Sequence, residues 1–198
     1  MIDIKSLTAE WIAEKRKRYF KDPNLMESMI HALYLLEQLK LTGLDFIFKG
    51  GTSLILLMKE PRRFSVDIDI IVSQSITKAK LEEYLYKLAG KSAFSRIELD
   101  EKRSYQSGIP KAHYKFIYNS NFPNRDPGGN VISNPERELL LDVLFAENHY
   151  PVLVTRPIET EWLIQKDLPL IVTTPDIDSI AGDKLAAFVE KTVKLTSR

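Results

Sequence analysis

The segment from residue 48 to residue 72, FKGGTSLILLMKEPRRFSVDIDIIV, constrains the fold more than any other part of the chain. The stretch DFIFKGG, which overlaps the start of this segment, is typical of a short buried strand that runs into the glycine pair Gly50–Gly51. TSLILLMK after the pair is typical of a short helix. VDIDIIV then predicts a second strand after a loop. A strand that runs into a glycine turn, a helix and another strand indicates an α/β or α+β domain.

Two aspartates interrupt the second of these strands. Residues two apart in a strand point to the same face, so Asp67 and Asp69 are expected side by side, with the apolar residues on the other face. Neighbouring carboxylates repel each other, and a divalent cation that prefers oxygen ligands, Mg²⁺ or Mn²⁺, would remove the repulsion. The alternative is an edge strand with one solvated face, because Asp-x-Asp occurs often by chance.

The glycine pair lies where a strand ends and a helix begins. The backbone N–H groups of Gly51, Thr52 and Ser53 can face an anion there, because the first turn of a helix leaves its N–H groups without intrahelical partners. Glycine also lets a phosphate approach the main chain closely. A plain turn is the alternative interpretation of Gly50–Gly51 taken alone.

A third carboxylate, Asp142, is the only charge in the strand-like run LLLDVLF. Burial of an unpaired charge is costly, so Asp142 needs a partner. One interpretation is a hydrogen-bonded aspartate of the core. The other is that its strand lies beside the strand of Asp67 and Asp69. Three carboxylates next to a glycine turn would then form a two-metal site for phosphoryl transfer.

The whole chain predicts one domain over residues 1–198, with a mixed central β-sheet flanked by helices. Helices are expected at about 6–40, the core at about 44–173, and a last helix at about 175–195. That helix has Thr174 as its expected N-cap and Pro175 as its first residue. The other expected elements are a helix at 77–90 and strands at 94–101, 111–119, 138–146, 151–160 and 168–173.

Lys184 falls within the apolar side of that last helix. At helical periodicity the apolar residues form one stripe, and the position of Lys184 lies inside it and not on the solvent face. The stripe consists of Ile177, Ile180, Ala181, Leu185 and Phe188. A lysine there either extends its ammonium group to solvent or meets a negative charge, for which a nucleoside triphosphate is the natural candidate.

Basic residues outside these motifs carry weaker signals. Arg62 and Arg63 lie in the loop before the aspartate strand, where they can contact a triphosphate or acceptor RNA; a solvated loop pair is the alternative. Lys15–Arg18 form a basic cluster that could hold a nucleic-acid backbone, although such a run on a helix is more often a solvated face. No role is assigned to the three histidines, which share no ligand spacing: His31, His113 and His149.

The composition narrows the class of protein. A formal net charge of +1 makes no case for nucleic-acid binding by the chain as a whole. The absence of cysteine excludes disulfides and cysteine-ligated zinc. The first twenty residues lack the unbroken apolar core of a signal peptide, and no apolar stretch approaches the roughly 20 residues that span a membrane. We therefore expect a soluble, cytoplasmic protein without membrane association.

Together these motifs resemble a known family. An apolar strand with Gly-Gly, an Asp-apolar-Asp strand and a later isolated Asp are the pattern of the nucleotidyltransferase fold shared with DNA polymerase β. More narrowly, FKGGTSL…RRFSVDIDI is similar to the AbiEii/AbiGii (MenT-like) nucleotidyltransferase toxins of bacterial toxin–antitoxin systems. The Lys-Gly-Gly-Thr stretch of that family matches residues 49–52, and its Arg-x-Ser-x-Asp-apolar-Asp segment matches Arg63 to Asp69. Its helical lysine matches Lys184 in GDKLAA.

The resemblance implies a site with defined roles for these residues. Asp67, Asp69 and Asp142 would hold two Mg²⁺ or Mn²⁺ ions, and Lys184 would neutralise the phosphates of an NTP. The residues implied in nucleotide binding are Gly50, Gly51, Thr52, Ser53, Arg63 and Ser65. In the family more helical sequence usually follows the lysine helix, so a short or truncated member is expected.

The resemblance also implies an activity. We expect transfer of NMP from an NTP to an acceptor hydroxyl, the tRNA 3′ end, with growth inhibition as the result and a cognate antitoxin encoded nearby. Three alternatives are left open: NMP transfer to a protein hydroxyl, phosphoryl transfer of kinase type, and a binding module that keeps the fold without the activity.

Overall fold

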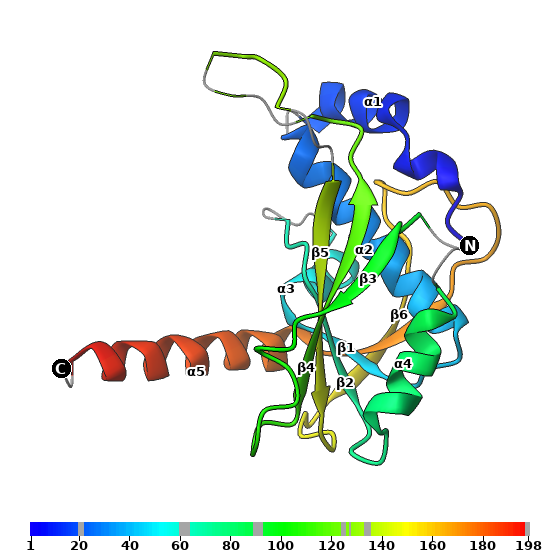
Figure 1. Ribbon diagram of the computed structural model, residues 1–198. Coiled ribbons are helices and arrows are strands. Elements are labelled where there is room, and N and C mark those ends of the chain that lie inside the picture. Colours follow the sequence, from blue (N-terminus) through cyan, green and yellow to red (C-terminus); the bar gives the residue numbers. More distant parts are fainter. Residues whose placement is uncertain are drawn as a thin grey trace.

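The fold is organised around one mixed β-sheet of seven strands (Figure 1). The computed structural model describes residues 1–19, 22–59, 64–88, 93–123, 126, 128–132 and 136–196, the last eight of them as helix backbone only. The strands are β1 (Ile47–Lys49), β2 (Ile68–Val72), β3 (Arg96–Leu99), β4 (Lys111–Asn119), β5 (Glu136–Phe145), β6 (Leu153–Pro157) and β7 (Ile171–Pro175). Their spatial order is β3-β4-β5-β2-β1-β7-β6. The pairs β2–β5 and β1–β7 are parallel, and the others are antiparallel. The glycine-turn and aspartate motifs therefore lie on neighbouring strands in the middle of the sheet.

One long helix supplies much of the core. The helical elements are η1 (Ile4–Leu7), α1 (Ala9–Tyr19), α2 (Pro23–Leu41), α3 (Gly50–Leu57), α4 (Lys78–Tyr86) and α5 (Ile177–Thr196). Asp22 begins α2 by accepting a hydrogen bond from the Asn24 N–H at 2.8 Å. Side chains on nearly every side of α2 are buried, and full burial of each leucine contributes roughly 1.5–3 kcal/mol. No helix in the described part of the chain is long and apolar enough to span a membrane.

The predicted fold class, a mixed sheet flanked by helices, is confirmed. Each predicted strand is present, with boundaries shifted by a few residues at most. The predicted helix from residue 6 is shorter than expected, because Thr8 separates η1 from α1. The Thr8 hydroxyl donates to the Lys5 carbonyl at 2.9 Å and accepts from the Trp11 N–H at 3.4 Å, so it ends one helix and begins the next.

The predicted start of the last helix is wrong. Thr174 and Pro175 belong to β7, where they pair with Val154 and Leu153 of β6. The helix begins two residues later, and Asp176 caps it by accepting from the Ser179 N–H at 3.0 Å. Strand pairing keeps the chain extended up to Pro175, and a sequence pattern of Thr-Pro contains no information about that partner strand.

The apolar stripe of α5 is not buried in the way that its periodicity predicts. Ile180 is 2% exposed, but Leu185 is 67% and Phe188 is 69% exposed. Figure 1 gives the reason, since only the first turns of α5 lie against the sheet and the rest of the helix projects away from it. Periodicity shows that a helix has an apolar side, but it does not show what covers that side.

A buried histidine lies at the centre of the helix–sheet packing. His31 is 3% exposed, and its ring stacks on Tyr118 with the centroids 3.9 Å apart. Its Nδ1 lies 2.9 Å from the Glu27 carbonyl oxygen. Burial lowers the pKa of His31 to about 4, and the hydrogen bond to Glu27 opposes this only partly. The histidine is therefore neutral in the folded protein at neutral pH.

His31 makes the stability of the fold sensitive to acid. Between pH 6.5 and about 4 the unfolded chain binds a proton that the folded chain does not, so the free energy of unfolding falls as the pH drops through this window. The expected loss is up to about 3 kcal/mol. His31→Phe keeps the stacked ring without the titrating group and should lack this component. Urea unfolding at several pH values tests this, and an identical pH dependence in both proteins would contradict it.

Candidate active site

Four charged or titratable side chains form a row across the middle of the sheet. Lys49 is paired with Asp69, Asp69 with Asp142, and Asp142 with His113. Residues directly opposite on neighbouring strands point to the same face, so the row runs over β1, β2, β5 and β4 on one side of the sheet. The predicted adjacency of Asp142 and the aspartate pair is confirmed. Asp67 is exposed and immediately precedes β2.

The glycine turn lies directly against this row. Gly50 has a φ of +81°, and a Cβ at this position would lie 2.9 Å from the Asp69 Cγ and closer still to its Oδ2. The Asp69 carboxylate thus occupies the space where any other residue would have a side chain. Helix α3 begins at Gly50, and Lys49 at its N-cap position makes no side-chain hydrogen bond to it. The N–H groups of its first turn can therefore bind an anion beside the carboxylates.

Two hydroxyl side chains hold the turn in place by hydrogen bonds, and a third packs against it. Thr52 Oγ1 donates to the Asp67 carbonyl at 2.6 Å, and Ser53 Oγ donates to the Gly50 carbonyl at 2.8 Å. Both residues are buried. Ser65 Oγ lies 2.9 Å from the position that a Cβ on Gly51 would take. The hydroxyls of Thr52 and Ser53 are engaged by the backbone, and the Ser53 N–H begins the intrahelical bonding of α3, so Thr52 could bind a nucleotide only through its N–H group.

The base of α5 reaches the same place. Lys184 Nζ lies 3.6 Å from the Cβ position of Gly51, although the residue as a whole is exposed. Its charge lowers the pKa of Asp69. The neighbouring Asp183 accepts a hydrogen bond from the hydroxyl of Tyr150, which lies between β5 and β6. The ammonium group of Lys184 therefore lies beside the glycine turn and close enough to Asp69 to lower its pKa. Of the two alternatives predicted for this lysine, this is the contact with a negative charge.

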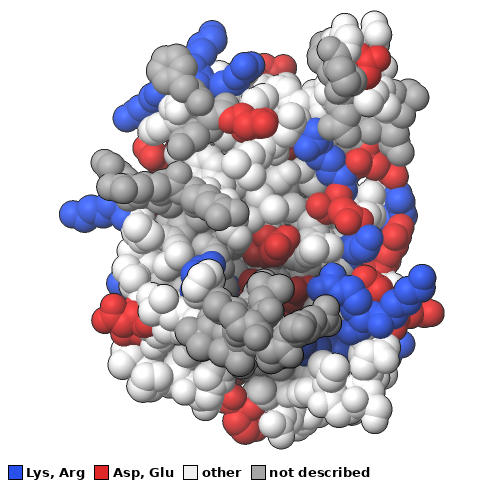
Figure 2. Space-filling model, turned by 90° about the vertical axis from the view of Figure 1, so that its left-hand side faces the viewer, with Lys and Arg blue, Asp and Glu red and all other residues white. Residues whose placement is uncertain are grey.

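The ionised carboxylates of Asp69 and Asp67 are destabilised in the absence of a bound cation. Burial raises the pKa of Asp69 to about 6, and the charges of Asp142 and Asp67 raise it as well, whereas Lys49 and Lys184 lower it. The carboxyl group of Asp67 is partly buried although the residue as a whole is exposed, and this burial and the charge of Asp142 raise its pKa, which Arg103 opposes. Figure 2, which faces the C-terminal end of α5, shows acidic side chains on this side of the molecule with Lys and Arg side chains beside them.

The donor set fits a hard divalent cation that is only partly enclosed by protein. Its oxygens come from the carboxylates of Asp67 and Asp69, whose pKa values are raised by burial and by the charge of Asp142. Among the described residues, no three His, Asp or Glu side chains are grouped closely enough to hold a metal ion by themselves. Mg²⁺ sites of phosphoryl-transfer enzymes commonly use one or two carboxylates and complete their coordination with substrate phosphates and water. The row with its neighbouring anion site suits that arrangement.

A comparison with protein families identifies the chain. A model described as nucleotidyl transferase AbiEii toxin, Type IV TA system, matches residues 34–198. The chain belongs to this family. The match spans every strand of the sheet and the helices α3, α4 and α5, and it confirms the predicted resemblance. No curated protein and no solved structure matches the chain. An antitoxin is the partner that membership of a type IV toxin–antitoxin family implies.

Sequence reasoning missed several groups that this AbiEii-family chain brings to the row. His113, to which no role was assigned, lies with its Nδ1 2.5 Å from Asp142 Oδ1. Arg103 lies close enough to act on Asp67, and Lys49, which the motif contains but to which no role was assigned, lies close enough to act on Asp69. One signal was present for His113, a polar residue facing away from the aromatic residues of its strand, but only the strand register shows that it faces Asp142.

One predicted site residue, Arg63, lies like Arg62 outside the described residues.

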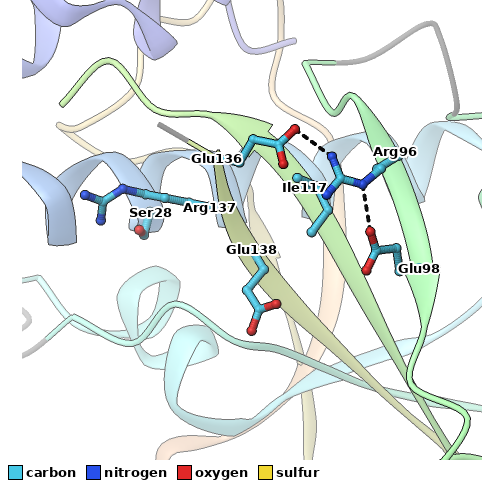
Figure 3. A pocket seen from close by; sticks show the side chains of 7 residues that line it. All are labelled: Ser28, Arg96, Glu98, Ile117, Glu136, Arg137 and Glu138. Atoms are coloured by element: carbon cyan, nitrogen blue, oxygen red, sulfur yellow. Dashed lines mark hydrogen bonds and ion pairs between the residues drawn. The ribbon is translucent and has the colours of Figure 1, made fainter. Parts of the chain in front are cut away.

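One pocket is not part of the candidate site. It has a volume of about 490 Å³ and is lined by Ser28, Arg96, Glu98, Ile117, Glu136, Arg137 and Glu138 (Figure 3). In it Arg96 bridges Glu136 and Glu98 at 2.6 and 2.7 Å. No predicted site residue lines this pocket, and Glu138 is about 13 Å along β5 from Asp142.

The contact between Gly50 and Asp69 predicts an unusually costly substitution. Gly50→Ala places a methyl group against the carboxylate, whereas Gly108→Ala tests positive φ alone, since Gly108 has a φ of +75° and nothing within 4 Å of its Cβ position. Both should lose about 1–2 kcal/mol from backbone strain. Gly50→Ala should lose roughly 1–3 kcal/mol more from the overlap. Urea unfolding measures both, and equal losses would contradict the close contact.

Asp69 should reduce the stability of the metal-free protein as the pH rises from about 4 to about 6, and the loss should persist at higher pH. Because its pKa is raised from 3.8 to about 6, the folded state binds more protons than the unfolded state in this window, and the free energy of unfolding falls as the pH rises through it. The loss is up to about 3 kcal/mol and is complete above the folded-state pKa. Asp69→Asn removes it. In EDTA the variant should gain stability relative to wild type from pH 4 to pH 8, and a constant difference would be evidence against the raised pKa.

Proposed function

We propose that this AbiEii-family chain transfers the NMP group of an NTP to the 3′-terminal hydroxyl of tRNA, and that this modification stops translation and growth. The observation that carries the proposal is the row of carboxylates beside the α3 N-terminus and Lys184. A charged metal–triphosphate complex needs both parts, oxygen ligands for the cation and positive groups for the phosphates. The two parts touch at the contact between Gly50 and Asp69.

The triphosphate would bind on the β1 side of the row. The N–H groups of Gly51, Thr52 and Ser53 are at the start of α3, where the helix dipole also favours an anion. Lys184 Nζ is next to Gly51 and would neutralise the β- and γ-phosphates. Arg63 is proposed to assist from the loop before β2. A triphosphate bound on this side of the row would have its α-phosphate next to Asp69.

The acceptor would approach from the other side of the row. Asp142 lies on β5, beyond Asp69 as seen from β1, with β4 and β3 next in the sheet. Asp67 and Asp69 would hold both ions, and Asp142 would hold the ion nearer the acceptor. Bound there, Mg²⁺ or Mn²⁺ would reduce the charge on the triphosphate and favour the ionised form of the attacking hydroxyl. Arg103, whose charge acts on Asp67, is available to the acceptor's own phosphates.

The proposed reaction is an in-line substitution at phosphorus. The acceptor hydroxyl passes its proton to water as its oxygen forms a bond to the α-phosphorus. The bond from that phosphorus to the oxygen bridging to the β-phosphate breaks, and pyrophosphate leaves. Positioning and charge neutralisation by Asp67, Asp69, Asp142 and Lys184 account for the catalysis, because phosphoryl-type transfer asks little covalent chemistry of the protein.

An RNA acceptor is supported by the family and by one local feature. Arg16, Lys17 and Arg18 are exposed on α1, and Lys15 lies over the Trp11 ring at 4.3 Å from its centroid. The described ion pairs include none of these four cations. Such a cluster can contact RNA phosphates away from the reacting end. A toxin that modifies tRNA would act in the cytoplasm.

The cost of the carboxylates argues against a binding module without activity. Burial and mutual repulsion raise the pKa values of Asp67 and Asp69, which lowers the stability of the protein. A fold that bound its partner without chemistry would gain stability by replacing either residue with a neutral one. The arrangement is useful where a cation has to be bound.

The proposal is tested by incubating the chain with total tRNA, Mg²⁺ and each NTP, labelled at the α-phosphate in one set of reactions and at the γ-phosphate in a parallel set. Label should enter RNA with one or more NTPs. Asp67→Ala should reduce the rate by about 100-fold or more, because it removes a proposed metal ligand and each 1.4 kcal/mol of lost transition-state stabilisation lowers the rate tenfold. Label from the α-phosphate in protein would favour a protein hydroxyl as the acceptor. Label from the γ-phosphate alone would favour kinase-type transfer. No transfer to any acceptor would contradict the enzymatic proposal.

A further inference from the structure

The hydrogen bond between His113 and Asp142 is the contact at the row that neither the motifs nor the proposed roles explain. His113 Nδ1 and Asp142 Oδ1 are 2.5 Å apart, and the two residues are directly paired between β4 and β5. The His113 side chain is 12% exposed and the Asp142 side chain 31%. The histidine is therefore largely enclosed, while the carboxylate it contacts remains accessible.

His113 is itself fixed by the segment between β3 and β4. Ser104, which is 5% exposed, accepts from the His113 N–H at 2.8 Å and donates to the His113 carbonyl at 3.3 Å. The next residue, Tyr105, has a φ of +54°, and its N–H donates to the Lys111 carbonyl at 2.8 Å. A non-glycine residue in this conformation costs about 1–2 kcal/mol. The two hydrogen bonds of Ser104 and the neighbouring contact of Tyr105 keep Ser104 against His113.

The hydrogen bond with His113 determines which oxygen of the Asp142 carboxylate is left to bind a cation. Nδ1–H of a neutral or protonated imidazole donates to a carboxylate, and here it engages Oδ1. Oδ2 is then the oxygen that can bind a cation, and the carboxylate cannot rotate without losing the hydrogen bond. Side chains that orient metal ligands in this way typically change metal affinity or activity by about 10–100-fold when they are removed.

We propose that His113 is a positioning residue that orients the Asp142 carboxylate for the cation on the acceptor side of the site. The inference rests on the proposed function, because it gives Asp142 a metal-binding role. Since the triphosphate would bind at α3 and α5, on the other side of Asp69, loss of His113 should affect turnover and cation binding but not NTP binding. A solely structural histidine would instead affect the stability of the β4–β5 pair.

The test uses two substitutions of His113 and a matched control. In His113→Asn, the amide nitrogen takes about the place of Nδ1 and can still donate to Asp142. His113→Phe keeps a ring but removes the donor. Lys115→Met serves as the control, because Lys115 lies two residues along β4 on the same face and makes only a partly exposed ion pair with Glu138, at 2.8 Å. Thermal unfolding first establishes that all three variants fold.

Binding of Mn²⁺ to each protein is then measured by electron paramagnetic resonance without nucleotide, and kcat and KM for the NTP are measured separately. His113→Phe should bind Mn²⁺ about 10–100-fold more weakly and lose kcat by a similar factor with KM unchanged. The Mn²⁺ affinity and kcat of His113→Asn and Lys115→Met should stay within about threefold of the wild-type values, a smaller change than that expected for His113→Phe.

Two results would overturn the role of His113 alone: Mn²⁺ binding and kcat in His113→Phe that equal those of wild type, or a His113→Asn protein as impaired as His113→Phe. Failure of the proposed function is a different observation. A folded wild-type chain that binds no Mn²⁺ and transfers no label would contradict the metal site, and the inference about His113 with it.

Discussion

The candidate site depends on the close contact between the Asp69 carboxylate and the backbone of Gly50. Because β1 and β2 are antiparallel with Lys49 opposite Asp69, the chain that leaves β1 must pass directly over the aspartate. A glycine with positive φ makes this possible, and α3 starts at that residue. The N–H groups of a helix N-terminus are thereby placed next to a carboxylate.

This contact links catalysis to stability. Burial raises the pKa values of Asp69 and Asp67, and the charge of Asp142 raises both further. The sheet tolerates them because the apolar face of the same strands packs into one core with α2, where Ile68, Ile70 and Leu141 are fully buried. The charges are stabilised only partly by Lys49 and Lys184. The protein therefore holds a negative site that a cation and its phosphates would complete.

Much of this was predictable from local patterns. The alternation of polar and apolar residues located β2, β4 and β5, and a single charge in an apolar run identified Asp142 as a residue in need of a partner. Patterns failed where a distant segment determines the outcome. Thr174 and Pro175 look like a helix start, but pairing with β6 keeps them extended. The apolar side of α5 looks buried, yet Leu185 is exposed because the helix projects away from the sheet.

By itself the sequence determined the fold class, the family, and which residues form the glycine turn and the aspartate strand, since these depend on residue types at short spacings. Only the tertiary structure decided which strands are neighbours, and hence that Asp142 lies between Asp69 and His113. It also decided that Lys184, more than 130 positions after the turn, ends beside Gly51. The physical reason is that strand register and helix placement depend on contacts between residues far apart in the chain, and these contacts leave no periodic signal in one sequence.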